Sequence, residues 1–171
     1  NFELGYRRFG QRHSAAAVLF HTLRRDQQVD LSSQQQAGDP NSFVYYIANA
    51  ASGTASGLEL EHRLRLTPAA RLGLTLGLLR TRVAEYSFWT GVGQQDTLGD
   101  RAAAHAPSYT FSVAGDLGRR HGPGARLELT GMDGFHYSQS QDHRAAAHRL
   151  VHAQLGYRGR DWSVTLWGRN L

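Results

Sequence analysis

At 171 residues the chain is long enough for one ordinary domain, and it contains no Cys, which excludes disulfides, thiolate metal sites and cysteine nucleophiles. All 19 basic residues are arginine, and the formal net charge is +5. The arginines are spread over alternating strand positions and turns instead of one patch interleaved with aromatics, so nucleic-acid binding is not favoured. Uninterrupted apolar stretches are far shorter than the roughly 20 residues that a transmembrane helix needs.

The pattern along the chain predicts about eight β-strands, because alternation of apolar and polar residues places them on opposite faces of a strand. The second strand is the least regular, since its AAAVLF core is apolar on both faces and could also form a short helix. No other segment needs a helix. In chain order the predicted strands are Phe2–Phe9, Ala15–Val29, Gly57–Leu66, Arg71–Ala84, Ser108–Leu117, Arg126–Phe135, Leu150–Arg158 and Trp162–Leu171.

The third and fourth predicted strands show the alternation most clearly. In GLELEHRLRL the leucines share one face, interrupted only by His62, and the opposite face mixes Glu and Arg. The fourth strand repeats the leucine face, but its other face is largely Gly and Thr, which suits the crowded interior of a barrel better than a water-facing surface. We therefore expect an outward, lipid-facing surface that includes Leu58, Leu60, Leu72, Leu74, Val113, Leu155 and Val164.

The links between the predicted strands alternate strictly in length. Short links at Gly10–Ser14, Thr67–Ala70, Gly118–Ala125 and Gly159–Asp161 alternate with longer ones at Asp30–Ser56, Tyr86–Pro107 and Tyr137–Arg149. Short turns at one end and long loops at the other are typical of an outer-membrane barrel, whereas a Greek-key sandwich has no such requirement. The predicted fold class is therefore all-β: an antiparallel up-and-down meander that forms a segment of a transmembrane β-barrel.

Aromatic residues near the strand ends fit the interfacial girdles of such barrels. The alternative fold is a soluble β-barrel or sandwich that acts as a binding module, in which the leucine face points inward. The girdle candidates are Tyr6, Phe9, Tyr109, Phe135, Tyr137, Tyr157 and Trp162.

Three segments resemble the barrel domain of TonB-dependent outer-membrane receptors. ASGLELEHRLRLTP resembles a strand of that family with its following Pro turn, HAPSYTFSVAGDL resembles the strand that opens with APxYTxS, and DWSVTLWGRNL resembles the strand before the last one. The three occur in the family's order and spacing, and Trp162–Leu171 is the most specific of them. The resemblance covers nearly the whole chain.

The resemblance implies a barrel of roughly 22 strands in the bacterial outer membrane. Residues 1–171 would be a single C-terminal segment of that barrel, because Asn1 and Leu171 both lie inside amphipathic runs, and the plug domain and the final strand would lie outside it. The implied partners are outer-membrane lipid, the TonB complex through the plug, and a scarce small-molecule nutrient. A ferric siderophore is the expected nutrient, with cobalamin and oligosaccharides as competitors.

The residues do not favour enzymatic, metal or cofactor chemistry. His148 and His152 are four positions apart, but in a strand this separates them by about 13 Å, too far to share an ion. Ser163 and His152 lack the GxSxG or comparable flanking of a hydrolase. We therefore expect no catalytic, cofactor-binding or metal-ligating residues. A passive porin and an outer-membrane enzyme barrel remain alternatives to a receptor.

The functional surface is expected in the long loops, because a receptor selects its ligand at the extracellular mouth. Aromatic side chains there are the natural contacts. An alternative interpretation places Tyr45, Tyr46, Phe88 and Trp89 in the girdle at the outer lipid interface. The ligand-loop candidates are Tyr45, Tyr46, Phe88, Trp89, His136 and Tyr137.

Overall fold

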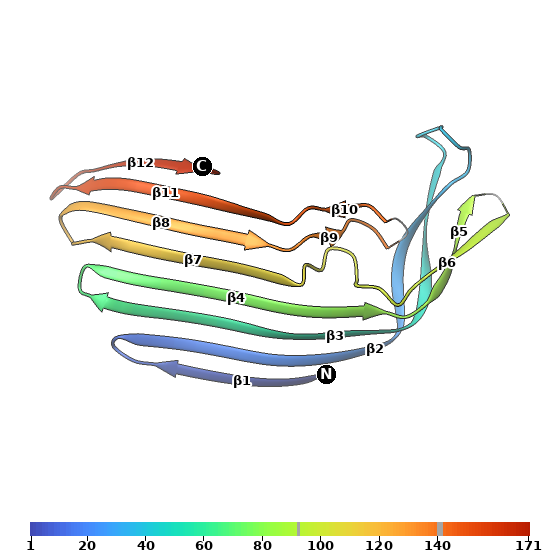
Figure 1. Cartoon of the computed structure of the whole chain (residues 1–171), viewed down its shortest axis with the longest axis horizontal. Helices are drawn as coiled ribbons and strands as arrows, with labels where there is room; N and C mark the ends of the chain where they lie inside the picture. The colour runs from blue at the N-terminus through green and yellow to red at the C-terminus, as the bar shows by residue number, and fades with distance from the viewer. Residues whose placement is uncertain (92, 140–141) are drawn as a thin grey trace.

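The computed structural model describes residues 1–91, 93–139 and 142–171, with the side chains of all of these except residues 50 and 51. Eight strands form one antiparallel sheet with the order β1-β2-β3-β4-β7-β8-β11-β12, drawn as an open wall in Figure 1. Each strand pairs with the sheet strand that follows it in the chain. The sheet strands are β1 Phe2–Phe9, β2 His13–Gln34, β3 Phe43–Thr67, β4 Ala70–Val83, β7 Tyr109–Gly118, β8 Gly122–Met132, β11 His148–Arg158 and β12 Ser163–Arg169.

The predicted meander of eight strands is confirmed, and so is the alternation of link lengths. The short links, residues 10–12, 68–69, 119–121 and 159–162, lie together at one end of the wall, which we call the turn end. The longer links, residues 35–42, 84–108 and 133–147, lie at the opposite end, the loop end (Figure 1). Positions 92, 140 and 141 of the expected long loops lie outside the described residues. None of the described residues forms a helix long and apolar enough to cross a membrane.

The prediction of a long first loop at Asp30–Ser56 is wrong. Strands β2 and β3 continue through most of it as one hairpin, paired as far as Gln34 opposite Phe43. The hairpin persists beyond the sheet because Val29 and Leu31 are buried by packing against other loop-end residues, which the local sequence does not reveal. The second loop also contains regular structure, β5 Tyr86–Gly91 paired with β6 Gln94–Leu98, and the third contains β9 Phe135–His136 paired with β10 Arg144–Ala145.

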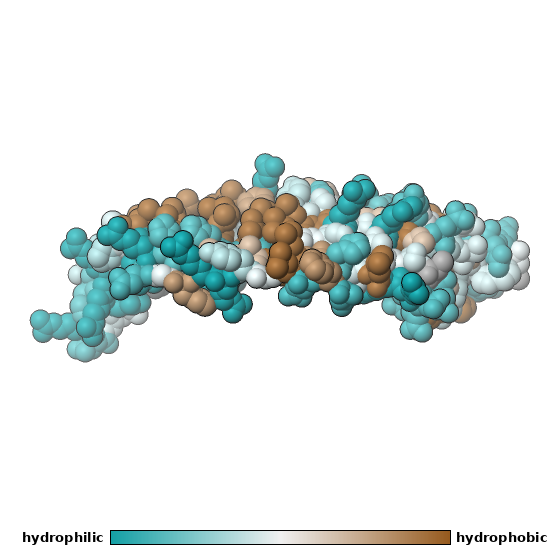
Figure 2. Space-filling model, turned by 90° about the horizontal axis from the view of Figure 1, so that it is seen from below, coloured by the Kyte–Doolittle hydropathy of each residue, from teal (hydrophilic) through white to brown (hydrophobic). Residues whose placement is uncertain are grey.

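One face of the sheet is apolar. Residues paired across strands share a face, and the register links Leu58 to Leu78, Leu74 to Val113 and Leu155 to Leu166. All seven residues predicted to face lipid lie on this apolar face. Their side chains are accessible, 61% for Leu155, so they are not buried against a second sheet as in a sandwich. Figure 2 shows hydrophobic residues gathered along one side over the middle of the molecule, with hydrophilic residues at both ends.

The opposite, polar face carries Gly, Ser, Thr and ion-paired charges. Arg126 holds Asp116 through two hydrogen bonds of 2.9 and 3.0 Å and Glu128 through a third of 3.0 Å. The hydroxyl of Ser112 donates to the other oxygen of Glu128 at 2.8 Å. These four residues come from β7 and β8 and occupy neighbouring rows, so the network fixes side chains that would otherwise be mobile.

Of the expected girdle residues, Phe9 lies on the polar face and Phe135 lies among the loop-end links. Phe9 pairs with Ser14 in the register of the polar face, and the Arg7 guanidinium lies 6.0 Å from its ring centre. Phe135 packs against His105 at the loop end, with ring centres 5.6 Å apart. Near the end of a strand, the sequence pattern leaves the position of the last paired residue uncertain by one. A shift of one residue moves a side chain to the opposite face of the sheet. By contrast, the rings of Tyr157 and Trp162 stack at 5.5 Å at the turn end, as a girdle pair can.

Candidate functional site

The loop end contains a small buried core. Val29 and Leu31 from β2, Val83 from β4, and Tyr86 and Phe88 from β5 pack together with at most 5% of each residue exposed. Burial of these apolar side chains joins the distal β2–β3 hairpin to the β5–β6 hairpin. The loop end is therefore an assembly of packed hairpins.

A groove of about 400 Å³ opens beside this core. The β2–β3 hairpin supplies Gln28, Asp30, Ser32 and Tyr45 to its lining, and the second and third links supply His105, Tyr137 and Gln139. Aromatic rings, amides, a hydroxyl and one carboxylate thus face a common space. Such a lining can hold a ligand by ring contact and directed hydrogen bonds.

Strand geometry separates the two neighbouring tyrosines of β3. Tyr46 pairs with Leu31 and lies on the side of the buried core, whereas Tyr45 pairs with Ser32 on the opposite side and is 80% exposed. The same alternation separates Phe88, which is 4% exposed, from Trp89, which is 46% exposed. Phe88 is thus a core residue of the loop end and presents its ring neither to ligand nor to lipid.

His136 lies in a charged corner beside the groove, with its side chain largely buried. Its Nδ1 is 3.9 Å from a carboxylate oxygen of Asp142, and the same oxygen is 3.2 Å from the guanidinium of Arg101. Burial is the main cause that lowers the pKa of His136, and the positive charges of Arg101 and Arg144 lower it further against the opposing effect of Asp142. The neutral imidazole is therefore favoured in the folded loop end.

Tyr86 connects this corner to the core. Its hydroxyl donates to the backbone carbonyl of Gln139, so the second and third links are joined by a directed bond. Burial raises the pKa of Tyr86, and the charge of Arg101 opposes this only in part, so the phenol keeps its proton. A protonated phenol is the form that donates this bond.

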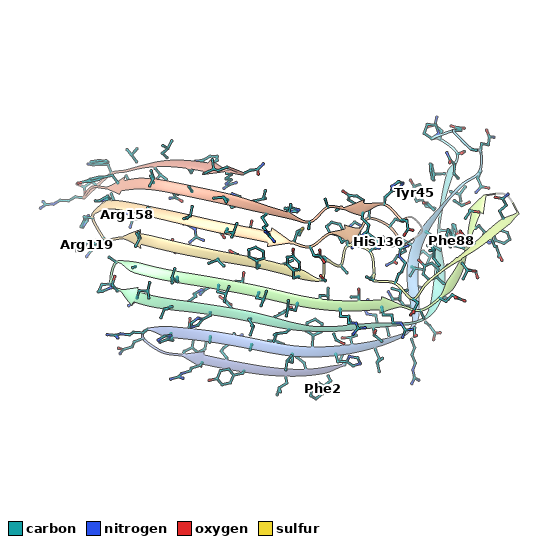
Figure 3. All side chains as sticks on the ribbon, viewed as in Figure 1. Phe2, Tyr45, Phe88, Arg119, His136 and Arg158 are labelled. Atoms are coloured by element: carbon teal, nitrogen blue, oxygen red, sulfur yellow. The ribbon has the colours of Figure 1, made fainter. Side chains whose placement is uncertain are left out.

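The six ligand-loop candidates therefore occupy different positions. Figure 3 places Tyr45, Phe88 and His136 together at the loop end, away from Arg119 and Arg158. Tyr45 and Tyr137 line the groove, Trp89 is exposed on β5 outside that lining, and Tyr46 and Phe88 support the assembly. Sequence reasoning missed Gln28, Asp30, Ser32, His105 and Gln139, because polar residues in a link carry no signal that distinguishes a groove wall from solvent-facing surface.

Metal-binding clusters are absent from the part of the chain that the structure describes: no group of three or more His, Asp or Glu side chains there could hold an ion. In the register of β11 with β8, His148 pairs with Met132 and His152 with Glu128, so the two histidines lie on separate rows.

Comparison with family models gives a match to the TonB-dependent receptor-like β-barrel over residues 1–171. The chain belongs to this family. The family is one of receptors and transporters and not of enzymes, as expected from the residues. Comparison with curated protein sequences gives no match.

Solved structures share the fold. The chain is similar to the ferric yersiniabactin uptake receptor FyuA from Yersinia pestis, with a TM-score of 0.73, 17% identity, and coverage of 99% of this chain and 24% of that one. The copper transporter OprC is similar with a TM-score of 0.72 and 12% identity, over 98% of this chain and 25% of that one. The ferric-catecholate import receptor Fiu from E. coli K12 is similar with a TM-score of 0.69 and 16% identity, over 99% of this chain and 22% of that one. The chain thus spans about a quarter of these proteins, and identities this low show the fold alone.

Proposed function

We propose that these residues form part of the wall of an outer-membrane receptor that imports a scarce nutrient, with energy supplied by the TonB complex. The observation that carries the proposal is the family match over residues 1–171, on a sheet with one apolar and one polar face. Lipid would contact the apolar face, and a plug domain outside this segment would contact TonB.

The proposed nutrient is a ferric siderophore. Two of the similar structures are a ferric yersiniabactin uptake receptor and a ferric-catecholate import receptor, and a third is a copper transporter. These cargoes differ chemically, so fold similarity supports uptake of a metal-containing ligand without selecting one. Cobalamin and oligosaccharides remain competitors.

The proposed contacts are the exposed aromatics of the loop end, Tyr45, Tyr137 and Trp89, with the amides of Gln28 and Gln139 as hydrogen-bonding groups. Aromatic rings supply large contact areas at a low cost in conformational entropy. The packed hairpins hold Tyr45 and Trp89 in place before ligand arrives, which reduces the ordering cost of binding.

Growth of a deletion strain on a panel of iron, cobalamin and carbon sources tests the function. Full-length protein should restore growth on one source, and removal of its TonB-contacting segment should abolish this. Growth that persists without that segment would favour a porin, and release of fatty acid by the purified protein would favour an enzyme.

A matched pair of variants tests the membrane orientation in the same strain. Replacement of Leu74 by Arg should prevent assembly of the full-length protein, while replacement of Thr75 should not. If the protein were a soluble binding module, fractionation would find the unaltered protein outside the membrane.

A further inference from the structure

The groove beside the loop-end core, which we call the loop-end groove, has one formal charge in its described lining. Its volume is about 400 Å³, and the charge is the carboxylate of Asp30. Arginine is absent from this lining, although the chain contains 19 basic residues. The other polar groups of the lining are amides, hydroxyls, phenols and the imidazole of His105. The proposed function requires only that the lining contacts a cargo, and it leaves the charge of that cargo open.

Strand alternation directs Asp30 into the loop-end groove. Val29 and Leu31, its neighbours on β2, are buried in the loop-end core with 3% of each residue exposed, so the side chain of Asp30 projects from the opposite side of the strand. That side also carries Gln28 and Ser32, which belong to the same lining. Burial of the two apolar neighbours therefore fixes the direction of the carboxylate.

The charge of Asp30 is not neutralised by the chain. Within the described residues its carboxylate forms no ion pair and no hydrogen bond, and the residue is exposed. An ionised carboxylate only accepts hydrogen bonds, so it attracts cations and N–H or O–H donors, whereas a like charge brought against it is repelled. An anionic cargo in the loop-end groove would meet this charge without a compensating guanidinium.

Gln139 supplies a second acceptor without a donor. Its side-chain oxygen Oε1 is buried and has no hydrogen-bond partner among the described residues. The backbone carbonyl of Gln139 accepts a hydrogen bond from the hydroxyl of Tyr86, which holds this part of the third link in place. A buried acceptor without a donor is destabilising, so a ligand N–H or O–H that reached Oε1 would form a favourable bond. Asp30 and Gln139 are therefore complementary to the same cargo chemistry, which is that of hydrogen-bond donors.

The positive charges around His136 lie outside the lining. Arg101 is held by Asp142 at 3.2 Å, and its side chain is only 11% exposed. Arg144 lies on β10, opposite His136 in the register with β9. Neither arginine belongs to the residues that line the loop-end groove, so the lining itself offers no guanidinium to a cargo anion.

We propose that the loop-end groove selects an uncharged or cationic cargo that presents N–H or O–H groups, and that Asp30 excludes anionic cargo. This inference rests on the proposed function and deepens it, because it names the charge class of the imported ligand. Ferric iron is neutralised by a full set of hydroxamate ligands, whereas a full set of catecholates leaves the complex anionic. Among ferric siderophores the loop-end groove therefore favours the hydroxamate class over the catecholate class.

Equilibrium binding to the purified full-length protein tests the inference. The probes are an uncharged ferric trihydroxamate, a cationic ferric trihydroxamate, an anionic ferric tricatecholate, cobalamin and an uncharged oligosaccharide. We expect the best uncharged or cationic probe to bind at least about tenfold more tightly than the tricatecholate. An affinity for the tricatecholate that comes within this factor of the best probe, or no binding of any other probe, would overturn the inference.

Two variants test whether Asp30 causes the selection. Asp30→Asn keeps the shape of the side chain and removes its charge, so the best probe should bind about fivefold more weakly, because hydrogen bonds to a charged acceptor are the stronger ones. Asp30→Arg places a guanidinium in the loop-end groove and should raise the affinity for the tricatecholate at least about tenfold. If Asp30→Arg does not assemble, Asp30→Asn decides alone, and an unchanged affinity for the best probe would overturn the inference.

Glu85→Arg is the matched control. Glu85 is exposed at the loop end and lies outside the lining of the loop-end groove, and its replacement changes the net charge by the same amount as Asp30→Arg. Glu85→Arg should leave the affinities for the best probe and for the tricatecholate unchanged. Equal effects of the two Arg variants would assign the selection to the overall charge of the loop end and overturn the role of Asp30.

Growth of the deletion strain tests the proposed function separately. Binding to purified protein does not need TonB, so uptake that persists without the TonB-contacting segment would reject the receptor and leave the binding result standing. Conversely, TonB-dependent growth on a ferric catecholate would support the receptor and overturn the proposed charge class.

Discussion

The phenol of Tyr46 on β3 bonds to both backbone groups of Trp89 on β5. It accepts a hydrogen bond from the Trp89 N–H at 2.6 Å and donates one to the Trp89 carbonyl at 3.2 Å. Trp89 is also where the register of β5 with β6 shifts, so these backbone groups sit at an irregularity of the ladder. The Tyr46 side chain thus supplies hydrogen bonds to the backbone of Trp89, where the pairing of β5 with β6 is irregular.

Replacement of Tyr46 by Phe should loosen the β5–β6 hairpin. Two hydrogen bonds disappear, each with a net contribution of about 0.5–1.5 kcal/mol, while the ring and its packing remain. Hydrogen exchange of the full-length protein should show faster exchange at residues 86–98. The matched control is Tyr45→Phe, because Tyr45 is exposed and its hydroxyl forms no bond within the described residues. Equal exchange in the two variants would contradict the supporting role of Tyr46.

Replacement of Leu74 by Arg should prevent or strongly slow assembly into the outer membrane. Leu74 lies on the apolar face opposite Val113, and an Arg near the bilayer midplane costs about 2–4 kcal/mol. The control is Thr75→Arg, which places the same side chain on the polar face between Glu61 and Ser112. Heat-modifiable migration of the full-length protein measures assembly. Equal tolerance at both positions would reject the assignment of the two faces.

Acidification should destabilise the corner around His136. Because its pKa is lowered in the folded state, the unfolded loop binds more protons, and stability rises with pH in this range. The full contribution is present above the ordinary value of 6.5 and is lost as pH falls from there through the lowered pKa. Hydrogen exchange at β9 and β10, measured relative to the intrinsic exchange rate at each pH, should therefore accelerate as the pH falls from about 7.5 to about 5.

The variant His136→Asn should remove most of this acceleration, because it cannot be protonated in that range. His143 lies in the same link with an exposed side chain, so His143→Asn is the matched control and should keep the pH dependence. If the pH dependence of exchange is unchanged in His136→Asn, a titrating group other than His136 causes it.

Replacement of Tyr45 or Trp89 by Ala should weaken binding of the imported ligand by about tenfold each, as for exposed aromatic anchors of an interface. Titration of purified full-length protein with the nutrient identified by growth measures this. Tyr6→Ala is the control, since Tyr6 is exposed on β1 and lies in the half of that strand that leads into the turn end, paired with Ala17. Unchanged affinity in both loop variants would support the girdle interpretation instead.

The sequence was sufficient to predict the sheet but not the loop end. Alternation such as Leu58, Leu60 and Leu64 is a local property, and each strand pairs with its neighbour in the meander, so local patterns determined the topology. The extension of β2 past Val29 depends on Val83 and Phe88, which are distant in the chain. No local pattern records that contact.

The candidate site was predictable only as a region. Loop length indicated the end at which we propose that a ligand is selected, and aromatic character indicated Tyr45 and Trp89. The adjacent pairs Tyr45–Tyr46 and Phe88–Trp89 have the same chemistry in sequence, and only the side of the strand separates them. The sequence could not show which member of each pair faces the core, because the hairpins themselves were not predicted.

The loop-end core separates two tasks among neighbouring residues. Val29, Leu31, Val83, Tyr86 and Phe88 keep the hairpins in shape, while Tyr45 and Trp89 are held on the surface by that shape. Surface positions can therefore change identity at little cost in stability, since substitutions away from a core are usually within about 0.5 kcal/mol. Under the proposed function, a lineage of such receptors can acquire a new ligand preference by exchanging a few exposed side chains, while the packed hairpins that present them stay unchanged.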